Sequence, residues 1–401
     1  MSVAQVVTTL ATRLALVAAG LLTSVITARY LGPDGRGQFF FWTTVAALVV
    51  QFGSGGLQAS NAYLLTRRGA DAGVLSANSL LVSLVAGLLL GVLALAVLGL
   101  GNPDRQVVGA RAAAVLMLAV SGLYIMLGSN LLVALGRVGE FNRVELVVRY
   151  GAVLVLLATA WAWRQVDSLL VALGLVSLAS CAFVLWRLQQ VAPLGRPSTT
   201  VLREGIGYGL RAYLAAGLGM LVARSNAFLL EPRVDAAEYG TWSIAMQFFD
   251  VMNLIPASVA LVLLPRILRA ERPHDMLGPQ MLLVGGLLTV VAAGFVLVGA
   301  PVIEFLYGAA FVPAYDHLLW GLPGLLGLGL TAILSQYLAA KGLPWSLVWV
   351  WLVVALLQGG LAWTLIPHHG VDGAMLSLSI AYLLGLGLIA ALVHNVRKRD
   401  A

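Results

Sequence analysis

Arginine side chains interrupt apolar segments of this sequence that are long enough to cross a membrane. Arg13 lies about 12 Å inside the first segment at a rise of about 1.5 Å per residue; Arg211 lies at a similar depth in a later segment, and Arg224 follows it. A guanidinium keeps its charge and forms paired hydrogen bonds to phosphate oxygens. Because a charge inside the bilayer costs about 2.5–3.5 kcal/mol on insertion scales, such residues mark functional sites by default. We therefore predict that the three arginines bind a phosphate group, although Arg13 and Arg211 are also near enough to the surface to extend to lipid headgroups.

Amide and hydroxyl side chains recur at helical spacing in two other apolar segments. The first set is Gln51, Ser54, Gln58 and Asn61, and the second is Gln247, Asp250 and Asn253. Polar groups at membrane depth must face protein or water rather than lipid. We predict that both sets line a cavity, where the amides bond the hydroxyl groups of a ligand. The alternative is hydrogen bonding between neighbouring helices, which contributes about 0.6–2 kcal/mol per contact.

Acidic residues are rarer still in these segments. Asp250 is the only one deep within any of them. We predict that it couples transport to an ion, as a proton or cation carrier, or that it pairs with Arg13 or Arg211 when no ligand is bound. Simple neutralisation of a charge is the alternative. Glu145 and Arg149 are one helical turn apart and are predicted to pair at the entry of another segment.

The composition indicates that the helices carrying these residues lie in a membrane. The chain has 401 residues, of which 60% are hydrophobic and 10% charged. Soluble globular domains are about 45–50% apolar and about 25% charged, so this composition excludes an ordinary soluble protein. It also excludes disorder, which requires low hydrophobicity and high charge.

Runs of about 20 apolar residues, the length that crosses the hydrocarbon core, predict an all-α polytopic membrane protein. We count twelve such runs: Val6–Tyr30, Gln38–Leu65, Val74–Leu100, Ala112–Leu135, Val144–Trp163, Ser168–Leu188, Gly205–Leu230, Tyr239–Ile267, Met276–Ile303, Ala314–Ala339, Trp345–Ile366 and Val371–Val393. The first run lacks a basic start and a cleavage site, so we expect a retained helix and not a secretion signal.

The basic residues outside these runs predict the orientation. With the N-terminus in the cytoplasm, most of the loop and tail arginines and lysines are cytoplasmic, and the opposite topology would invert that ratio. Because cytoplasmic loops carry the excess of Lys and Arg, we expect both termini in the cytoplasm. The net charge of +7 would suggest nucleic acid in a soluble protein. Here the arginines lie in or beside the bilayer, and no nucleic-acid partner is expected.

A polar linker divides the predicted helices into two sets of six. The expected domains are residues 1–192, a cytoplasmic linker at 193–203, and residues 204–401 with a short basic tail. Thr12-Arg13-Leu14 followed by Ala18-Ala19-Gly20 is similar to Leu210-Arg211-Ala212 followed by Ala215-Ala216-Gly217. Six is an even number, so both sets enter the membrane from the same face. We predict two lobes related by a pseudo-twofold axis along the membrane normal.

Several signatures of enzymes are missing from the sequence. Cys181 is the single cysteine, and the five histidines form no zinc-binding spacing. There is no phosphate-cradling loop of a nucleotide hydrolase and no nucleophile elbow. The outer loops are short, which disfavours a polymerase or ligase with a folded external region. We expect no enzymatic activity, no cofactor and no metal.

The first predicted hairpin resembles a known family over about 45 residues. Its motif is Ala28-Arg29-Tyr30-Leu31-Gly32-Pro33, Gly35 and Gly37-Gln38-Phe39, followed by Gly53-Ser54-Gly55-Gly56-Leu57, Tyr63-Leu64-Leu65 and Arg67-Arg68. These residues are similar to bacterial polysaccharide-biosynthesis membrane proteins, the O-antigen and lipid-linked oligosaccharide flippases of the multidrug/oligosaccharidyl-lipid/polysaccharide (MOP) exporter superfamily. Beyond the hairpin, only helix number, topology and length match.

The resemblance implies a flippase that moves a polyprenyl-pyrophosphate-linked oligosaccharide across the bacterial inner membrane by alternating access, for surface polysaccharide such as O-antigen, capsule or exopolysaccharide. Arg13, Arg211 and Arg224 would then bind the pyrophosphate, and the two polar sets would bind sugars. Partners would be membrane lipid, the glycan substrate, and glycosyltransferases and a polymerase of the same pathway. The helices near the C-terminus have few polar residues, so we expect no second ligand site there. Two alternatives stay open: a cation-coupled multidrug-type exporter, which would favour acidic binding residues, and a non-transporting scaffold for polysaccharide enzymes.

Overall fold

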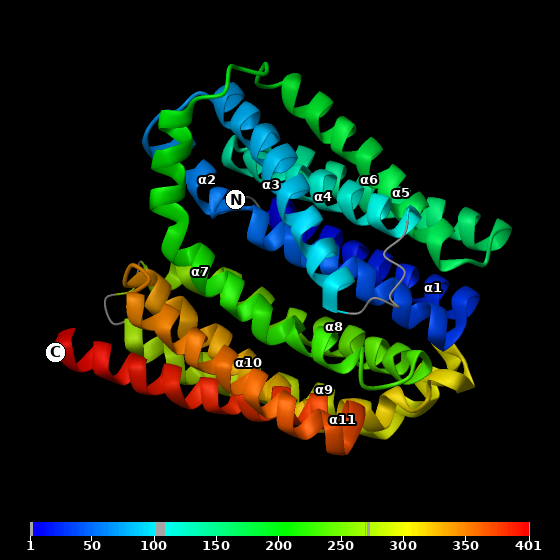
Figure 1. Cartoon of the computed structure of the whole chain (residues 1–401). Helices are drawn as coiled ribbons and strands as arrows, with labels where there is room; N and C mark the ends of the chain where they lie inside the picture. The colour runs from blue at the N-terminus through cyan, green and yellow to red at the C-terminus, as the bar shows by residue number, and fades with distance from the viewer. Residues whose placement is uncertain (1–2, 102–108, 269, 271–272, 401) are drawn as a thin grey trace. The chain divides into compact units, whose positions relative to one another are not determined.

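The computed structural model describes residues 3–101, 109–268, 270 and 273–400. Arg105, Arg269 and Arg272, which contribute to the predicted charge bias, lie outside these residues. The described chain forms helices and turns. A chain that crosses a membrane is expected to do so, because its backbone polar groups must form hydrogen bonds within the protein. The long helices are α1 (Val3–Gly53), α3 (Ala72–Gly101), α4 (Ala110–Ala134), α5 (Val138–Ala162), α6 (Val166–Gln189), α7 (Thr199–Leu230), α8 (Ala236–Ile267), α9 (Leu277–Tyr307), α10 (Ala314–Ala340) and α11 (Trp345–Asp400); α2 (Leu57–Arg67) and the 3₁₀ turns η1 (Pro273–Met276) and η2 (Ala309–Phe311) are short (Figure 1).

Ten candidate membrane-spanning helices are present among the described residues, where the sequence predicts twelve runs. Two of them join a pair of predicted runs across a break: α1 is broken at Gly32 (φ 67°) and α11 at Gly370 (φ 51°). Glycine adopts this left-handed region without steric cost. In α11 the chain reverses at the break, because Gln358 Nε2 donates to Ser377 Oγ at 3.3 Å although the residues are 19 positions apart. A straight helix would separate them by about 28 Å.

A turn at Ser54–Gly56 divides the predicted run Gln38–Leu65 between α1 and α2. Gly55 and Gly56 have φ values of 54° and 81°, outside the helical region. The polar set of that run therefore does not follow one continuous helix. The helical spacing on which its prediction rests is interrupted between Ser54 and Gln58.

The chain forms two compact units. Unit 1 comprises Met1–Leu31 and Gln38–Tyr213, and unit 2 comprises Gly32–Gly37 and Leu214–Ala401. The first half of α7 belongs to unit 1, where it packs on α2. The Tyr63 and Tyr208 rings stack with centroids 3.8 Å apart, and a Cβ on Gly209 would lie 2.5 Å from the Gly56 carbonyl oxygen.

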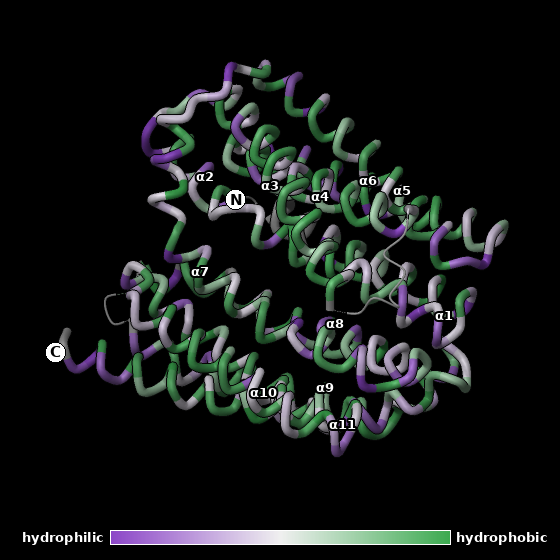
Figure 2. Tube along the Cα trace, in the orientation of Figure 1, coloured by the Kyte–Doolittle hydropathy of each residue, from purple (hydrophilic) through white to green (hydrophobic). Residues whose placement is uncertain are grey.

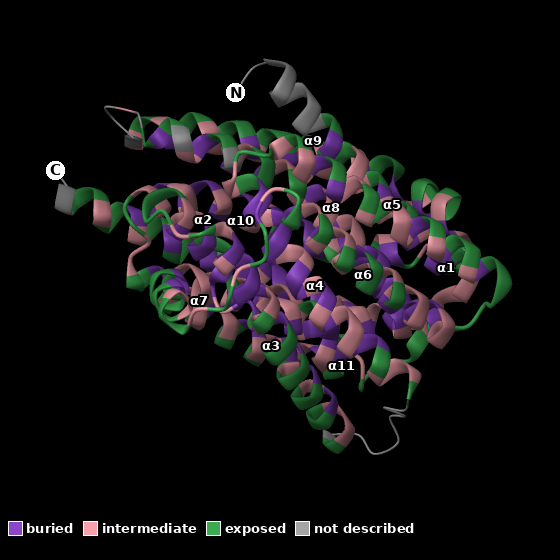
Figure 3. Ribbon diagram, turned by 90° about the horizontal axis from the view of Figure 1, so that it is seen from above, coloured by how far each residue is buried: buried purple, intermediate pink, exposed green. Residues whose placement is uncertain are grey.

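The core of unit 1 surrounds α4, which is drawn largely as buried residues in Figure 3. Buried Leu64, Leu75, Tyr124, Leu131 and Val184 join α2, α3, α4 and α6. At the other end of α4, Arg111 Nε pairs with the Asp167 carboxylate at 2.6 Å. Apolar packing and one salt bridge thus hold α4 against its neighbouring helices.

Unit 2 is organised around α10 and the two halves of α11. Gly324 and Gly327 let α10 approach the backbone of Ser379 and Tyr382 closely. A buried network joins α7 to both halves of α11: Gln358 Nε2 donates to Asn226 Oδ1 at 2.7 Å, and Asn226 Nδ2 donates to the Ala374 carbonyl at 2.6 Å.

Large apolar side chains cover much of the outer faces of both units. Leu297 and Phe305 on α9, for example, are 80% and 79% exposed. Figure 2 shows hydrophobic residues along most of each helix and hydrophilic ones mainly near helix ends. Such extensive apolar exposure is unusual on a soluble monomer and fits contact with lipid.

Candidate functional site

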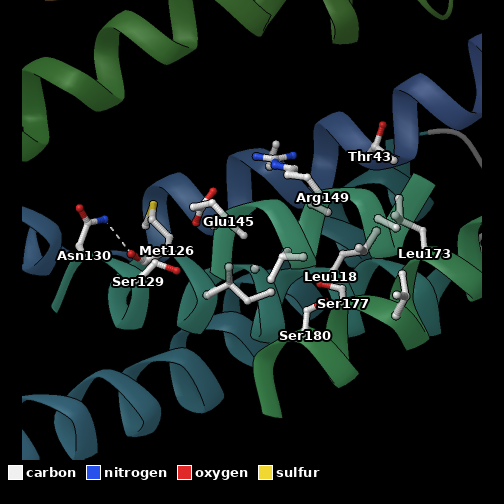
Figure 4. Close-up of a pocket in the computed structure, with 18 of the residues that line it drawn as sticks. Thr43, Leu118, Met126, Ser129, Asn130, Glu145, Arg149, Leu173, Ser177 and Ser180 are labelled. Atoms are coloured by element: carbon white, nitrogen blue, oxygen red, sulfur yellow. Dashed lines mark hydrogen bonds between the residues drawn. The ribbon is translucent and has the colours of Figure 1, made fainter. Parts of the chain in front are cut away.

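A cavity of about 580 Å³ lies within unit 1 (Figure 4). Five elements surround it: the second half of α1, then α2, α4, α5 and α6. Its volume is within the roughly 300–1,000 Å³ of ordinary ligand pockets. Much of its wall is apolar, including Leu118, Met126 and Leu173, so the polar groups among these residues define what it can bind.

The polar groups of the cavity include several with free hydrogen-bonding capacity. Asn130 Nδ2 donates to the Met126 carbonyl at 2.7 Å, which leaves the Asn130 side-chain oxygen free to accept. The Ser177 and Ser121 hydroxyls bond each other at 2.6 Å. The Ser129 hydroxyl is buried and has no hydrogen-bond partner among the described residues. Buried polar groups are normally paired, so this hydroxyl is an exception to that rule.

Two opposite charges line the same cavity from α5. Glu145 is half-buried and Arg149 exposed, and Figure 4 shows both side chains along one side of the cavity. They are one turn apart, the spacing at which such residues commonly pair. Among the described residues neither forms an ion pair, so the pair predicted at the entry of this helix is not present. Both groups are therefore available to a ligand in the cavity.

Arg13 and Arg211 lie in unit 1 but not in the wall of this cavity. Both are exposed, on α1 and on the first half of α7, and neither has a salt-bridge partner in the described part of the chain. Tyr150 Oη donates to the Ala15 carbonyl at 2.9 Å. This bond ties α5, next to Arg149, to α1 two residues beyond Arg13.

The four members of the first polar set have different surroundings. Gln58 is exposed and lines the cavity, and Gln51 is half-buried. The Ser54 hydroxyl donates to the Gln51 carbonyl at 2.8 Å, and Asn61 Nδ2 donates to Ser79 Oγ on α3 at 3.0 Å. Of the four side chains, only Gln58 therefore faces the cavity.

Unit 2 brings Arg224 and Asp250 together. Arg224 Nη2 lies 2.6 Å from Asp250 Oδ2, with side chains 19% and 41% exposed. Arg224 Nη1 is buried, and no described residue is its hydrogen-bond partner. The sequence predicts a cationic partner for Asp250 but names Arg13 or Arg211. The structure instead pairs it with the arginine of the neighbouring α7.

A second cavity, of about 410 Å³, lies within unit 2 between α7, α8, α10 and α11. Its polar lining consists of Asn253, Ser335, Gln336 and Tyr382, with Trp351 beside them. Gln247, one of the predicted set, is half-buried on α8 and does not line it. The sequence predicts no second ligand site here, whereas the structure has a neutral, partly polar pocket.

Most of the polar wall of the first cavity lies outside the residues that the sequence predicts. It includes Ser129 and Asn130 on α4 and Ser177 and Ser180 on α6. The spacing of three between Ser177 and Ser180 was a usable signal. Serine is common at helix contacts in membranes, however, so that signal does not distinguish cavity from interface. No group of His, Cys, Asp and Glu in the described part of the chain could hold a metal ion.

A family model described as "Polysaccharide biosynthesis protein" matches residues 26–316. The structure of lipid II flippase MurJ in an inward closed conformation is similar with TM-score 0.72 and 16% identity, over 98% of this chain and 88% of that one. An inward-facing multidrug resistance MATE family transporter of the MOP superfamily gives TM-score 0.72 and 14% identity, over 96% of both chains.

A mutant form of the Vibrio cholerae MATE transporter VcmN gives TM-score 0.65 and 14% identity, over 98% of this chain and 99% of that one. These likenesses show a shared fold. No curated protein sequence matches the chain.

Proposed function

The chain belongs to the polysaccharide biosynthesis protein family, and on that premise we propose that it is a flippase for a polyprenyl-pyrophosphate-linked oligosaccharide. It is an integral membrane protein with the fold of MOP-type flippases and exporters. The substrate crosses the bacterial inner membrane by alternating access and supplies the assembly of a surface polysaccharide. Glycosyltransferases and a polymerase of the same pathway are the proposed partners.

The observation on which this proposal depends is the cavity of unit 1. It is about 580 Å³ in volume and lined by amides, hydroxyls and two charges inside an otherwise apolar bundle. A polar cavity at membrane depth has to be filled by water or a polar ligand. A sugar-phosphate headgroup matches these groups, because its hydroxyls both donate and accept while its phosphates accept.

We assign the pyrophosphate to Arg149 and Arg13, on adjacent helices, and sugar hydroxyls to Gln58 and Asn130. Arg211 and Arg224 stay proposed phosphate contacts, and Gln51, Ser54, Asn61, Gln247 and Asn253 stay proposed sugar contacts. Asp250 is the proposed ion-coupling group, since protonation or cation binding there would release the Arg224 guanidinium. An ion pair that opens in one state gives a transporter a two-state element.

The proposed architecture is twelve spans in two six-helix lobes with cytoplasmic termini. The reversal of α11 at Gly370 supports counting it as two spans, and the break at Gly32 supports the same count for α1. Two lobes of six spans related by an axis along the membrane normal suit a carrier that rocks around a central site.

A second candidate function is export of small organic cations. Glu145 in the cavity favours it, because a carboxylate attracts a cation, and the fold is shared with multidrug transporters. Arg149 in the same cavity disfavours it. A scaffold without transport would leave the polar cavity without a use.

The test is reconstitution of the full chain in proteoliposomes. We expect transbilayer movement of a polyprenyl-pyrophosphate oligosaccharide, and loss of that movement in Arg149→Gln. Arg143→Gln changes an exposed arginine of the same helix outside the cavity and should transport normally. Movement of a fluorescent organic cation without movement of the lipid would replace the flippase assignment with drug export.

A further inference from the structure

Glu145 has no evident use in binding a pyrophosphate, yet it lies in the cavity beside the proposed phosphate ligand. Among the described residues that line the cavity, only Glu145 and Arg149 are charged. The carboxylate would repel a phosphate, and it does not neutralise Arg149. A carboxylate in the wall of a largely apolar cavity calls for a partner of its own.

The chemistry of the two groups restricts what can occupy the space between them. A carboxylate only accepts hydrogen bonds and a guanidinium only donates them. A ligand that satisfies both must present an acceptor to Arg149 and a donor to Glu145. Phosphate is the acceptor; a sugar hydroxyl or a protonated amine is the donor.

The spacing of the two groups suits a phosphate and the sugar attached to it. Four residues along a helix advance about 6 Å, which is comparable to the width of one sugar ring. Beside these charges, Gln58 and Asn130 are neutral amides, which would tolerate many sugars. Glu145 is therefore the group that would distinguish sugars by their charge.

We infer that Glu145 is a specificity residue that selects a neutral or amino sugar next to the phosphate and rejects a uronic acid. The inference rests on the proposed function and names the sugar class of that same cavity. A uronic acid would place a second carboxylate against Glu145, and like charges at close range are strongly unfavourable.

The experiment measures binding of three matched probes to the full chain in lipid nanodiscs. The probes are farnesyl pyrophosphate linked to galactose, galactosamine or galacturonic acid; relative to galactose, one has an ammonium group and the other a carboxylate. We expect galacturonic acid to bind at least tenfold more weakly than galactose, which corresponds to about 1.4 kcal/mol. We expect galactosamine to bind at least as tightly as galactose.

Three variants distinguish a loss of sugar selection from a loss of the fold. Glu145→Gln keeps the shape and removes the charge, and should bring the galactose and galacturonic acid affinities within twofold of each other. Glu140→Gln is the matched control, because Glu140 lies on the same helix outside the cavity and pairs with Arg137 and Arg187. It should keep the tenfold preference, whereas Arg149→Gln should weaken all three probes together.

Two results would overturn the inference: equal binding of galactose and galacturonic acid by the native chain, or an unchanged preference in Glu145→Gln with an unaltered thermal unfolding curve. Both leave the flippase assignment intact, since the probes still bind. Failure of all three probes and of farnesyl pyrophosphate alone would instead refute the proposed function.

Discussion

The ion pair between Arg224 and Asp250 should behave as one energetic unit in unit 2. At 2.6 Å between the charged atoms, the Coulomb attraction is about 6 kcal/mol at an effective dielectric constant of about 20. Much of that attraction is offset by the desolvation of both groups. Because the Asp250 side chain is 41% exposed, solvent reduces the net coupling further, and we expect about 1–2 kcal/mol.

A double-mutant cycle of Arg224→Gln and Asp250→Asn measures that coupling. Asp250→Asn should destabilise the protein more than Arg224→Gln, because it leaves a guanidinium with its Nη1 already buried and unpaired. The double variant should be more stable than the sum of the two losses by about 1–2 kcal/mol. The assay is unfolding by sodium dodecyl sulfate in mixed micelles, followed by tryptophan fluorescence.

A matched cycle controls for charge alone. Arg233 bonds the Leu229 carbonyl and faces the Trp363 ring at the end of α7, so it has no role in this ion pair. Arg233→Gln combined with Asp250→Asn should be additive within about 0.5 kcal/mol. If the Arg224 and Asp250 substitutions were also additive within about 0.5 kcal/mol, the two charges would not interact. That result would refute the proposed switch.

Four further substitutions test the packing. Gly209→Ala should destabilise the protein by about 1–3 kcal/mol because its Cβ would collide with Gly56. Gly207→Ala is the control: its Cβ meets nothing, and it should stabilise the protein by about 0.5–1 kcal/mol. Thermal unfolding measures both changes, and a rise in melting temperature for Gly209→Ala would contradict the close packing. Gln358→Leu should cost about 1–3 kcal/mol because it leaves the side-chain oxygen of Asn226 on α7 buried without its donor, and equal stability in detergent unfolding would contradict the network. Gly370→Ala should cost about 1–2 kcal/mol because φ is 51°, and an unchanged melting temperature would refute strain at that turn.

Most of the helices could be predicted because each depends on composition within a short window. Runs of about 20 apolar residues located α3, α4, α6 and α10 to within a few residues. The same method treated Gln38–Leu65 as one helix, because two adjacent glycines do not lower hydropathy enough to end an apolar run. The positive φ of Gly55 and Gly56 ends α1 there and shifts the polar side chains that follow. Hydropathy therefore locates a span without fixing the direction of each side chain.

The candidate site was harder to predict because its groups are brought together by packing between helices. Helical spacing correctly states that Glu145 and Arg149 are neighbours on α5, and from that it predicts an ion pair. It contains no information about the space beside the helix, where both charges line the cavity and form no ion pair in the described part of the chain. The same holds in unit 2, where Asp250 finds its partner on α7 across an interface that only the fold creates. A charged residue in an apolar segment thus marks a site from sequence alone, whereas its partner, and hence its chemistry, is decided by which helices pack against it.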